Sequence, residues 1–354
     1  MRVCILGENL TSLTLAKALL RLKIRVDIIS NNKKVLYPKS RSLGISKSNI
    51  DYFNNHIVDI KKLSWNLDKI EIFTDNILNK NLLNFDNDRK FLFSTIKNYQ
   101  LFNLLKKEVI KFKSFKKKKV FINNNYDLII NTDFNHYITK KFFYKRLGKD
   151  YHGSAYTTII KHKKISNNTA TQIFTINGPI AYLPISNYET SLVFSINKKM
   201  NFDNEFIKSQ IKKFNLKYKI LKISNIEKFN LSSFHLRSYY HKNILAFGDL
   251  IHRVHPLAGQ GFNMTLRDIQ SLVEIINDQI SLGLPIDSSI CREFEKKNKH
   301  KNFIFSQGID LIYEFFNFER KTDNIFLNKT INLFGKNKSI MKTLSNIADN
   351  GYLT

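Results

Sequence analysis

One stretch of this sequence carries more information than any other, and it reads Gly248-Asp249-Leu250-Ile251-His252-Arg253-Val254-His255-Pro256-Leu257-Ala258-Gly259-Gln260-Gly261-Phe262-Asn263. It follows an apolar run, Ile244 to Phe247, that predicts a short buried strand. A carboxylate directly after such a strand points into the crevice beyond the sheet edge, where open α/β sheets bind ligands. The ionised Asp249 carboxylate only accepts hydrogen bonds, so it suits the hydroxyl groups of a polyol.

The second half of this stretch predicts a place for a flat ring in front of a helix. Gly259 and Gly261 allow the backbone to approach such a ring closely. From Phe262 to Ile276 the apolar residues recur at helical spacing, which predicts an amphipathic helix. The free N–H groups and the positive dipole end of that helix point at the position of the ring.

The order of the other patterns predicts an α/β fold. Apolar runs at Val3–Leu6 and Val26–Ile29 lie on either side of a helical pattern, which is typical of a βαβ unit. A further helix is predicted over Ile96–Phe112, and a buried strand over Tyr126–Ile130. From Ala155 to Ile196 the period drops to two, which predicts an antiparallel sheet.

These patterns predict two interleaved domains. Residues 1–150 and 240–354 are expected to form a discontinuous, Rossmann-like nucleotide-binding domain that ends in C-terminal helices. Residues 151–239 are expected to form an inserted substrate domain, built on a mixed or antiparallel β-sheet. Residues 66–96 alternate like strands, and part of them is a candidate addition to the substrate sheet.

The net charge of +28, from 57 Lys and Arg against 29 Asp and Glu, raises the question of an anionic partner. Lys, Asn, Ile and Phe are abundant whereas Gly and Pro are scarce, which is the composition that A- and T-rich codons produce. The lysines are scattered, and the one dense run, Lys116–Lys119, predicts a solvated turn before a strand. No zinc spacing, Walker loop or nucleic-acid motif accompanies the charge, so we predict no nucleic-acid partner.

The cysteines and the apolar segments bear on the compartment. The two cysteines, Cys4 and Cys291, cannot build a disulfide framework, which favours a reducing environment. Glu8 and the segment Arg21–Arg25 interrupt the apolar N-terminal residues, so no signal peptide is predicted. No window reaches the roughly 18 uninterrupted apolar residues of a membrane span. We expect a cytoplasmic protein, with peripheral attachment to the inner face of the membrane as an alternative.

The Gly248–Asn263 stretch resembles the GD…HPxxGQGxN signature of flavin-dependent aromatic monooxygenases, especially the hydroxylases of ubiquinone biosynthesis. The resemblance implies that the cofactor is FAD and that Gly248 and Asp249 hold its ribityl chain. It also implies a set of residues around the isoalloxazine ring: Pro256, Gly259, Gln260, Gly261 and Asn263. One departure is Thr265, where the family usually has glycine.

Other segments extend this resemblance along the chain. Tyr151–Ala155 and Phe174–Pro184 resemble the substrate-domain strands of the same hydroxylases, and Ile347–Gly351 resembles their tail. Arg41–Ser46 resembles the segment whose arginine approaches the flavin, which implies that Arg41 lies near the cofactor. The substrate-domain strands provide candidate residues for a substrate pocket over the flavin, with simple packing of the sheet as the alternative: Phe174, Ile180, Tyr182 and Pro184.

The N-terminal fingerprint departs from the family pattern Gly-x-Gly-x-x-Gly, because this chain has Gly7-Glu8-Asn9-Leu10-Thr11-Ser12. Asn9 tolerates a left-handed backbone, so we expect the turn to persist, and Ser12 is small enough for close packing. Ser30 stands where an acidic residue normally binds the adenosine ribose, and a neutral hydroxyl is a weaker partner. Gly7, Asn9, Ser12 and Ser30 are therefore the residues predicted to hold the adenosine half of FAD.

Two further features bear on cofactors. The segment Asp127–Phe134 resembles the family's second flavin motif but has Asp133-Phe134 in place of Asp-Gly, which argues against tight FAD binding. His252 and His255 lie three residues apart without a third ligand at metal spacing, so structural roles are favoured and no metal is predicted. No Gly-x-Ser-x-Gly elbow supports hydrolysis.

The resemblance implies a FAD-dependent monooxygenase that hydroxylates a prenylated phenol or quinone precursor in ubiquinone biosynthesis. NAD(P)H or another donor would reduce FAD transiently, O₂ would form a flavin C4a-hydroperoxide, and the ring would attack its distal oxygen. Because the flavin does the chemistry, no catalytic side chain is named. Two alternatives stay open: a non-catalytic scaffold subunit of the biosynthetic complex with a degenerate FAD site, and another flavin oxidoreductase on the same fold.

Overall fold

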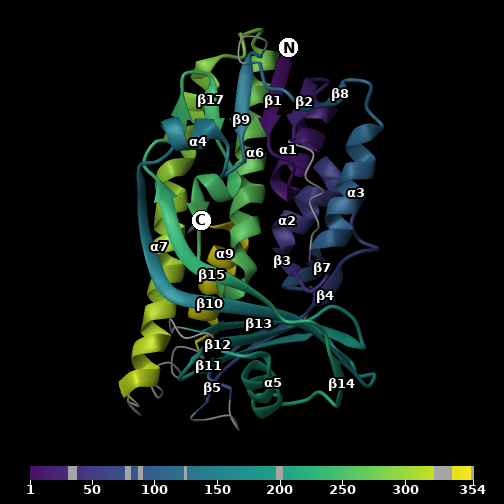
Figure 1. Cartoon of the computed structure of the whole chain (residues 1–354), viewed down its shortest axis with the longest axis vertical. Helices are drawn as coiled ribbons and strands as arrows, with labels where there is room; N and C mark the ends of the chain where they lie inside the picture. Colours follow the sequence, from purple (N-terminus) through teal and green to yellow (C-terminus); the bar gives the residue numbers. More distant parts are fainter. Residues whose placement is uncertain are drawn as a thin grey trace.

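The computed structural model describes residues 1–30, 38–75, 81–86, 91–122, 126–196, 202–322 and 337–351. Figure 1 shows two halves stacked along the long axis, with the N-terminus in the upper half. The long helix α7 (Ser288–Thr322) runs beside both halves, and β10 (Arg146–His162) curves from the upper half into the lower one. The expected α/β fold with an inserted sheet is confirmed.

The upper half contains a six-stranded sheet in the order β16-β17-β9-β1-β2-β8. All neighbouring strands are parallel except β16 and β17. Most of the central strands are continuous apolar runs, as expected for parallel strands that are buried on both faces. The main helices beside this sheet are α1 (Leu10–Arg21), α3 (Asn98–Ile110) and α6 (Gln260–Ser281). Its strands are β1 (Arg2–Leu6), β2 (Arg25–Ile29), β8 (Phe115–Lys118), β9 (Leu128–Asn131), β16 (Tyr240–His241) and β17 (Ile244–Ala246).

The dense lysine run forms a strand, not the predicted turn. Residues Phe115–Lys118 are β8, an edge strand parallel to β2. Lys117 Nζ lies 2.5 Å from Glu8 Oε2, and Lys118 Nζ lies 2.7 Å from Asp27 Oδ2. These lysines neutralise two largely buried carboxylates, so their charge is used inside the fold, and charged residues are common on edge strands.

The lower half contains a nine-stranded mixed sheet, in the order β18-β15-β10-β13-β12-β11-β5-β6 with β14 paired to β10. Helix α5 (Asn204–Lys213) covers one of its faces. β5 runs parallel to β11 and β6 pairs with β5, so two strands from residues 66–96 belong to this sheet. The remaining bounds are β5 (Lys69–Thr74), β6 (Leu83–Asp86), β11 (Thr169–Thr175), β12 (Gly178–Pro184), β13 (Glu189–Ile196), β14 (Ile220–Ile223), β15 (Glu227–Leu236) and β18 (His252–Arg253).

A small third sheet, in the order β3-β7-β4, lies between the two halves in Figure 1. It consists of β3 (Ser42–Ser46), β7 (Phe93–Lys97) and β4 (Trp65–Leu67), and α2 (Lys47–Tyr52) follows β3 directly. The C-terminal helix α9 (Lys338–Asn350) is anchored there, because Asp349 Oδ1 accepts hydrogen bonds from the Ser48 N–H (2.9 Å) and Oγ–H (2.7 Å).

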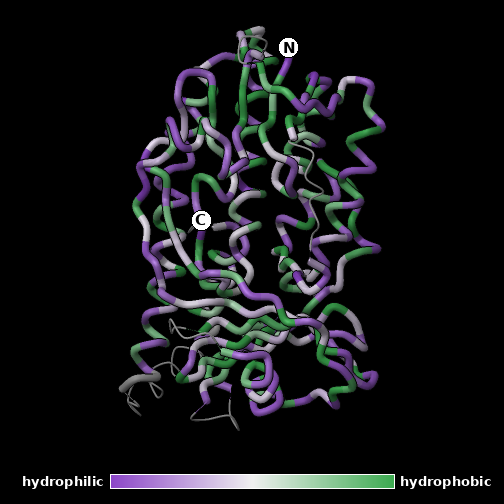
Figure 2. Tube along the Cα trace, viewed as in Figure 1, coloured by the Kyte–Doolittle hydropathy of each residue, from purple (hydrophilic) through white to green (hydrophobic). Residues whose placement is uncertain are grey.

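Two large apolar cores stabilise the halves. The larger core surrounds β1, β2 and β9 together with α1 and α6, and the second lies between the lower sheet and α5. Figure 2 shows hydrophobic residues concentrated along the strands of the upper sheet. Among the described helices, none combines the length and hydropathy that a membrane crossing requires.

Candidate functional site

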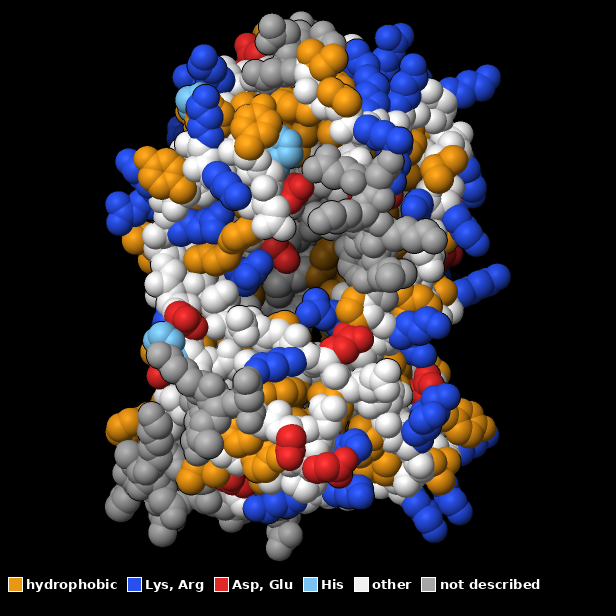
Figure 3. Space-filling view, viewed as in Figure 1, with side chains coloured by type: hydrophobic (Ala, Val, Ile, Leu, Met, Phe, Trp, Pro, Cys, Tyr) orange, Lys and Arg blue, Asp and Glu red, His pale blue; other side chains and the backbone are white. Residues whose placement is uncertain are grey.

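The Gly248–Asn263 stretch begins at the carboxyl end of β17, where the crevice is predicted. Gly248 has a φ of +65°, and a Cβ built there would lie 2.7 Å from Thr11 Cγ2, so the turn against α1 requires glycine. Asp249 is exposed, and within the described ranges no hydrogen bond or ion pair occupies its carboxylate. Figure 3 shows a hollow between the two halves on the face that it displays. Asp249 therefore presents a free carboxylate beside the sheet edge.

Helix α6 starts without a side-chain cap. Its N-cap, Gly259, has a left-handed backbone with a φ of +65° and makes no side-chain hydrogen bond to the helix. A Cβ built at Gly259 would lie 3.3 Å from the Gly44 N, so the loop is pressed against β3. An uncapped helix N-terminus presents N–H donors and a positive dipole end to a ligand.

Asn263 clamps β3 to the start of α6. Its Oδ1 accepts hydrogen bonds from the Ser46 N–H (2.9 Å) and from Asn49 Nδ2 (3.1 Å). Its Nδ2 donates to the carbonyl oxygens of Gly44 (3.0 Å) and Gly259 (3.3 Å). A carboxamide has two donors and two main acceptor sites, so these bonds engage the whole group. The side chain of Asn263 therefore shapes the loop, and its place beside the isoalloxazine stays a prediction.

Gly261 and Gln260 leave space and an unsatisfied acceptor at the same end of α6. A Cβ built at Gly261 would meet only Val254 Cγ2, at 3.9 Å. Gln260 is 8% exposed, and its Oε1 is buried without a hydrogen-bond partner in the part of the chain described. Buried polar atoms normally have partners, so this acceptor suits a ligand with an N–H group, such as the pyrimidine end of a flavin. This end of the site fits the ring.

We expect Gly261→Ala to have opposite effects on stability and on FAD affinity. The added methyl group meets no protein atom closely, and replacing a helical glycine by alanine stabilises a helix by roughly 0.5–1 kcal/mol. The same methyl group is expected to intrude on the predicted ring position and to weaken FAD binding. Thermal unfolding of the apo-protein and titration with FAD measure the two effects. Gly308→Ala in α7, where a Cβ would meet nothing within 4 Å, is the control with unchanged FAD affinity.

The turn before α1 differs from its prediction in one respect. Gly7 has a φ of +96°, and a Cβ there would lie 2.9 Å from Thr132 Oγ1, so the first glycine of the fingerprint is required. Asn9, however, has φ −141° and ψ −178°, an extended backbone rather than the expected left-handed one. The reason is that Asn9 is the N-cap of α1. Its Oδ1 accepts from the Ser12 N–H (2.9 Å), and Ser12 Oγ accepts from the Asn9 N–H (2.7 Å).

We expect Asn9→Gly to bind FAD at least as tightly as the unchanged chain. Glycine removes the cap and leaves the Ser12 N–H free for a phosphate, at a cost of only a few tenths of a kcal/mol in folding stability. Fluorescence titration with FAD is the measurement. Asp203→Gly, which removes the N-cap of α5, is the control for a lost cap outside the site. A weaker FAD affinity for Asn9→Gly than for this control contradicts the expectation.

Ser30 and Arg41 lie in two different segments, at the end of β2 and before β3. Ser30 follows β2, is 7% exposed, and donates a hydrogen bond from Oγ to Glu8 Oε2 (3.1 Å). Arg41 precedes β3, and its guanidinium lies 4.5 Å above the ring centre of Phe229. Arg41 Nε is buried without a hydrogen-bond partner in the described part of the chain. After Gln260 Oε1, Arg41 Nε is a second buried polar atom without a partner, and it precedes β3, the strand that contacts the loop at Gly259.

Asp133 and Phe134, which replace the Asp-Gly of the second motif, lie just beyond β9. A Cβ built at Gly7 would lie 3.2 Å from Asp133 Cβ, so this motif contacts the N-terminal turn. Phe134 forms cation–π contacts: the guanidinium carbon of Arg146 lies 4.1 Å from its ring centre, and that of Arg253 lies 5.4 Å away. The ring of Phe134 therefore contacts two arginines, one from β10 and one from β18.

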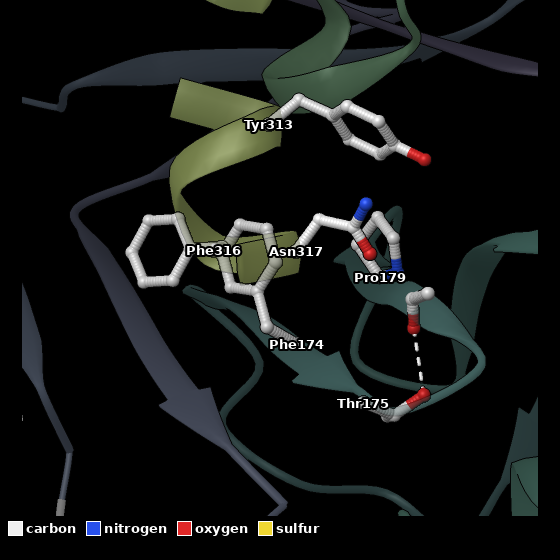
Figure 4. A pocket seen from close by; sticks show the side chains of 7 residues that line it. Phe174, Thr175, Pro179, Tyr313, Phe316 and Asn317 are labelled. Carbon is white, nitrogen blue, oxygen red and sulfur yellow. Dashed lines mark hydrogen bonds between the residues drawn. The ribbon is translucent and has the colours of Figure 1, made fainter. Parts of the chain in front are cut away.

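The substrate-pocket prediction divides between the two faces of the lower sheet. Phe174 pairs with Pro179 across β11 and β12, and Phe174 stacks on Phe316 of α7 at 3.8 Å between ring centres. Figure 4 shows a small pocket there, lined by Phe174, Pro179, Tyr313 and Asn317, with the hydrogen bond from Thr175 Oγ1 to the Gly178 carbonyl at its edge (2.7 Å).

Ile180 and Tyr182 point to the opposite face, so their assignment to the pocket is corrected. Both belong to the core against α5, and Tyr182 Oη donates to the Ile211 carbonyl (2.8 Å). Pro184 has the same parity in β12, and its carbonyl accepts a hydrogen bond from Thr95 of β7. The physical reason is that side chains alternate between the two faces of a strand. This alternation predicts which residues share a face, but it does not predict which face packs against α5.

His255 is a buried residue whose surroundings the sequence did not reveal. It lies between Tyr151 and Tyr313, with ring centres at 5.1 Å and 4.2 Å. Burial lowers the pKa of His255 to about 3, so the ring is neutral at physiological pH. Neither ring nitrogen has a hydrogen-bond partner within the described residues. His252 instead bonds through Nε2 to Asp268 Oδ2 (2.6 Å), and no metal-binding group of three or more ligands occurs in the described ranges.

Comparisons with known proteins first define the class. Residues 184–281 match the family model described as a FAD binding domain. The p-nitrophenol 4-monooxygenase of Pseudomonas putida DLL-E4 matches with a TM-score of 0.79 at 12% identity, over 97% of this chain and 96% of that one. HpxO of Klebsiella pneumoniae, solved with FAD and uric acid, matches with a TM-score of 0.76 at 10% identity, over 98% and 96%. The chain has the aromatic-hydroxylase fold of FAD-dependent monooxygenases, and the match to a FAD-binding-domain model supports the expected cofactor, FAD.

The sequence relatives are more specific. The chain is 30% identical over 149 residues to 3-demethoxyubiquinol 3-hydroxylase of Escherichia coli (strain K12), which is 40% of this chain and 38% of that protein. It is 27% identical over 218 residues to the mitochondrial ubiquinone biosynthesis monooxygenase COQ6 of Dictyostelium discoideum, 51% and 42% of the two chains. The resemblance to the ubiquinone-biosynthesis hydroxylases is thus confirmed, and the chain spans about two fifths of the length of these relatives.

Proposed function

We propose that this protein is a FAD-dependent monooxygenase that hydroxylates a prenylated phenol or a related quinone precursor in ubiquinone biosynthesis. The observation that carries the proposal is the arrangement of residues 248–263, which we call the flavin loop. The exposed Asp249 carboxylate, the open space at Gly261 and the unpartnered Gln260 oxygen all lie in one stretch of chain. The names of the sequence relatives support the choice of substrate class.

The residues of the loop hold and orient the cofactor. Asp249 accepts hydrogen bonds from the ribityl hydroxyl groups. The uncapped start of α6 would supply N–H donors and a positive dipole end to the flavin, which would stabilise the negative charge of its reduced form. Gly259 and Gly261, which have no side chains, would let the ring approach the backbone closely. When bound, FAD supplies the activation of O₂.

The proposed substrate wall is the face of the lower sheet turned away from α5. Ala181 and Leu183 point to this face, because their neighbour Tyr182 packs against α5. Phe174 and Pro179 continue the wall toward α7 (Figure 4). These apolar groups exclude water from the reacting ring and suit a phenol with a prenyl tail.

The proposal includes a reductant and a membrane surface. NAD(P)H is the transient electron donor that we propose, because FAD must be reduced before it reacts with O₂. A prenylated substrate resides in a membrane, so we propose peripheral association there, together with partners of a biosynthetic complex. Figure 3 shows Lys and Arg spread over the whole visible face, so the net charge of +28 acts as a diffuse attraction to anionic lipids that weakens with salt.

One observation favours a second function, a non-catalytic scaffold subunit. Helix α1 is capped by Asn9, and the reciprocal bonds with Ser12 occupy donors that a pyrophosphate normally uses. A chain that no longer holds the adenosine half of FAD would contribute to the complex only through contacts. The intact flavin loop favours the enzyme.

Rescue of ubiquinone production in cells that lack one ring hydroxylase tests both functions. We expect the unchanged chain to restore ubiquinone and Asp249→Ala to fail, because only catalysis needs the flavin. The purified protein is expected to release FAD on denaturation, and to consume O₂ only with an electron donor and a prenylated phenol. Rescue by both versions would identify a scaffold. Failure of both with FAD bound would indicate another substrate, and no binding in excess FAD would reject the enzyme.

A further inference from the structure

The end of β2 lacks the acidic side chain that dinucleotide-binding βαβ units have at this position. In dinucleotide-binding βαβ units, a carboxylate about twenty residues after the glycine turn binds the ribose hydroxyl groups of adenosine. Here that position is Ser30, which is buried and neutral. Its Oγ donates to Glu8 Oε2 (3.1 Å). The serine therefore orients a carboxylate that comes from another part of the chain.

Glu8 reaches this position from the turn between β1 and α1. The Gly7 N–H donates to the Ile29 carbonyl (3.0 Å), so the turn lies directly against the end of β2. The Glu8 side chain is only 6% exposed, which means that the fold holds it in place. The carboxylate of Glu8 thus lies beside Ser30, at the carboxyl edge of the parallel sheet where the adenosine of a dinucleotide is bound.

The charges around Glu8 keep it ionised. Burial raises the pKa of Glu8. The hydrogen bond and charge of Lys117 and the charge of Lys106 lower the pKa by more than burial raises it, so the pKa lies below its ordinary value. Lys117 Nζ lies 2.5 Å from Oε2, whereas Lys106 Nζ lies 3.6 Å from Oε1, beyond hydrogen-bonding distance. Within the described residues Oε1 has only that long ion pair, so its capacity to accept a hydrogen bond is unused.

We propose that Glu8 supplies the carboxylate that binds the adenosine ribose of FAD, in place of the acid missing at Ser30. The inference rests on the proposed function, because it assigns a residue of the same cofactor site. Ser30 and Lys117 are positioning residues: the serine hydroxyl and the ammonium hold Oε2, and Oε1 faces the ribose hydroxyl groups. The ligand class is a nucleotide with adenosine, so FMN, which has no adenosine, does not use Glu8.

The test compares FAD with FMN on the purified full chain. Glu8→Gln keeps the size of the side chain and removes its charge, and we expect about a tenfold weaker Kd for FAD with an unchanged Kd for FMN. A second substitution, Ser30→Glu in the Glu8→Gln background, returns a carboxylate to the end of β2 and is expected to recover FAD affinity. Thermal unfolding of each apo-protein verifies that the variants fold.

Several outcomes overturn the assignment. Equal losses for FAD and FMN mean that Glu8 only supports the fold, and no loss means that it does not touch the nucleotide. Tighter FAD binding by Glu8→Gln means that the carboxylate merely neutralises Lys106 and Lys117 beside the pyrophosphate. The proposed function fails separately, when the unchanged chain binds neither FAD nor FMN.

Discussion

Asp249→Ala is expected to weaken FAD binding by about one to two orders of magnitude, the largest effect on affinity in the site. Hydrogen bonds to a charged group contribute roughly 1.5–3 kcal/mol, and about 1.4 kcal/mol corresponds to a factor of ten. Asp249 is exposed and no described residue bonds to its carboxylate, so the apo-protein should unfold at an unchanged temperature. Fluorescence titration with FAD, at fixed salt, is the measurement.

A matched control separates the position of the carboxylate from its charge. Glu205→Ala removes an exposed carboxylate on α5, on the far face of the lower sheet, and should leave FAD affinity unchanged. Asp249→Asn keeps the size of the side chain and should bind FAD with an intermediate affinity, because a neutral amide oxygen still accepts hydrogen bonds. If Asp249→Ala loses no more affinity than Asn9→Gly, the ribityl chain lies elsewhere.

Asn263→Ala is expected to have the largest effect on stability, a loss of roughly 3 kcal/mol in the free energy of unfolding. The substitution removes four hydrogen bonds and leaves the buried Ser46 N–H and Gly44 carbonyl without their partners. Because Gly44 also contacts Gly259, the flavin loop should loosen and FAD affinity should fall as well. Urea denaturation of the apo-protein gives the stability, and FAD titration gives the affinity.

Asn168→Ala is the control for this substitution. Its amide Nδ2 also donates a side-chain hydrogen bond, to Asp68 Oδ2 (2.6 Å), but the pair is exposed. Exposed substitutions of this kind change stability by about 0.5 kcal/mol or less. A loss below about 1 kcal/mol for Asn263→Ala would show that β3 and α6 are held together by apolar contacts and not by this clamp.

Local patterns were sufficient for most of the elements in the upper half. The apolar runs that became β1 and β2, and the helical spacing that became α6, depend on neighbours a few residues apart. The prediction of a turn at Lys116–Lys119 was wrong, because Lys117 and Lys118 of β8 form ion pairs with Glu8 and with Asp27 of β2. Those carboxylates are close only after the sheet has formed.

The faces of the lower sheet illustrate a second limit. Period two in Gly178–Pro184 groups Ile180 with Tyr182, but it does not say whether that group meets the cofactor or a helix. The packing of α5 settled the matter, and it buried Tyr182 on the far side from Phe174. Tyr313 and Asn317 of α7 also line the small pocket, and no pattern in the sequence predicted this.

The sequence by itself determined the class of fold and predicted FAD and its loop, because strand and helix periods and the Gly248–Asn263 signature are local properties of the chain. Only the tertiary structure decided which side chains are free to meet a ligand. Asn263 and Gly44, 219 residues apart, became hydrogen-bond partners, and so did Ser30 and Glu8, 22 residues apart. The physical reason is that a buried polar group takes whichever partner the folded chain brings within about 3 Å, and that distance is set by packing rather than by spacing along the sequence.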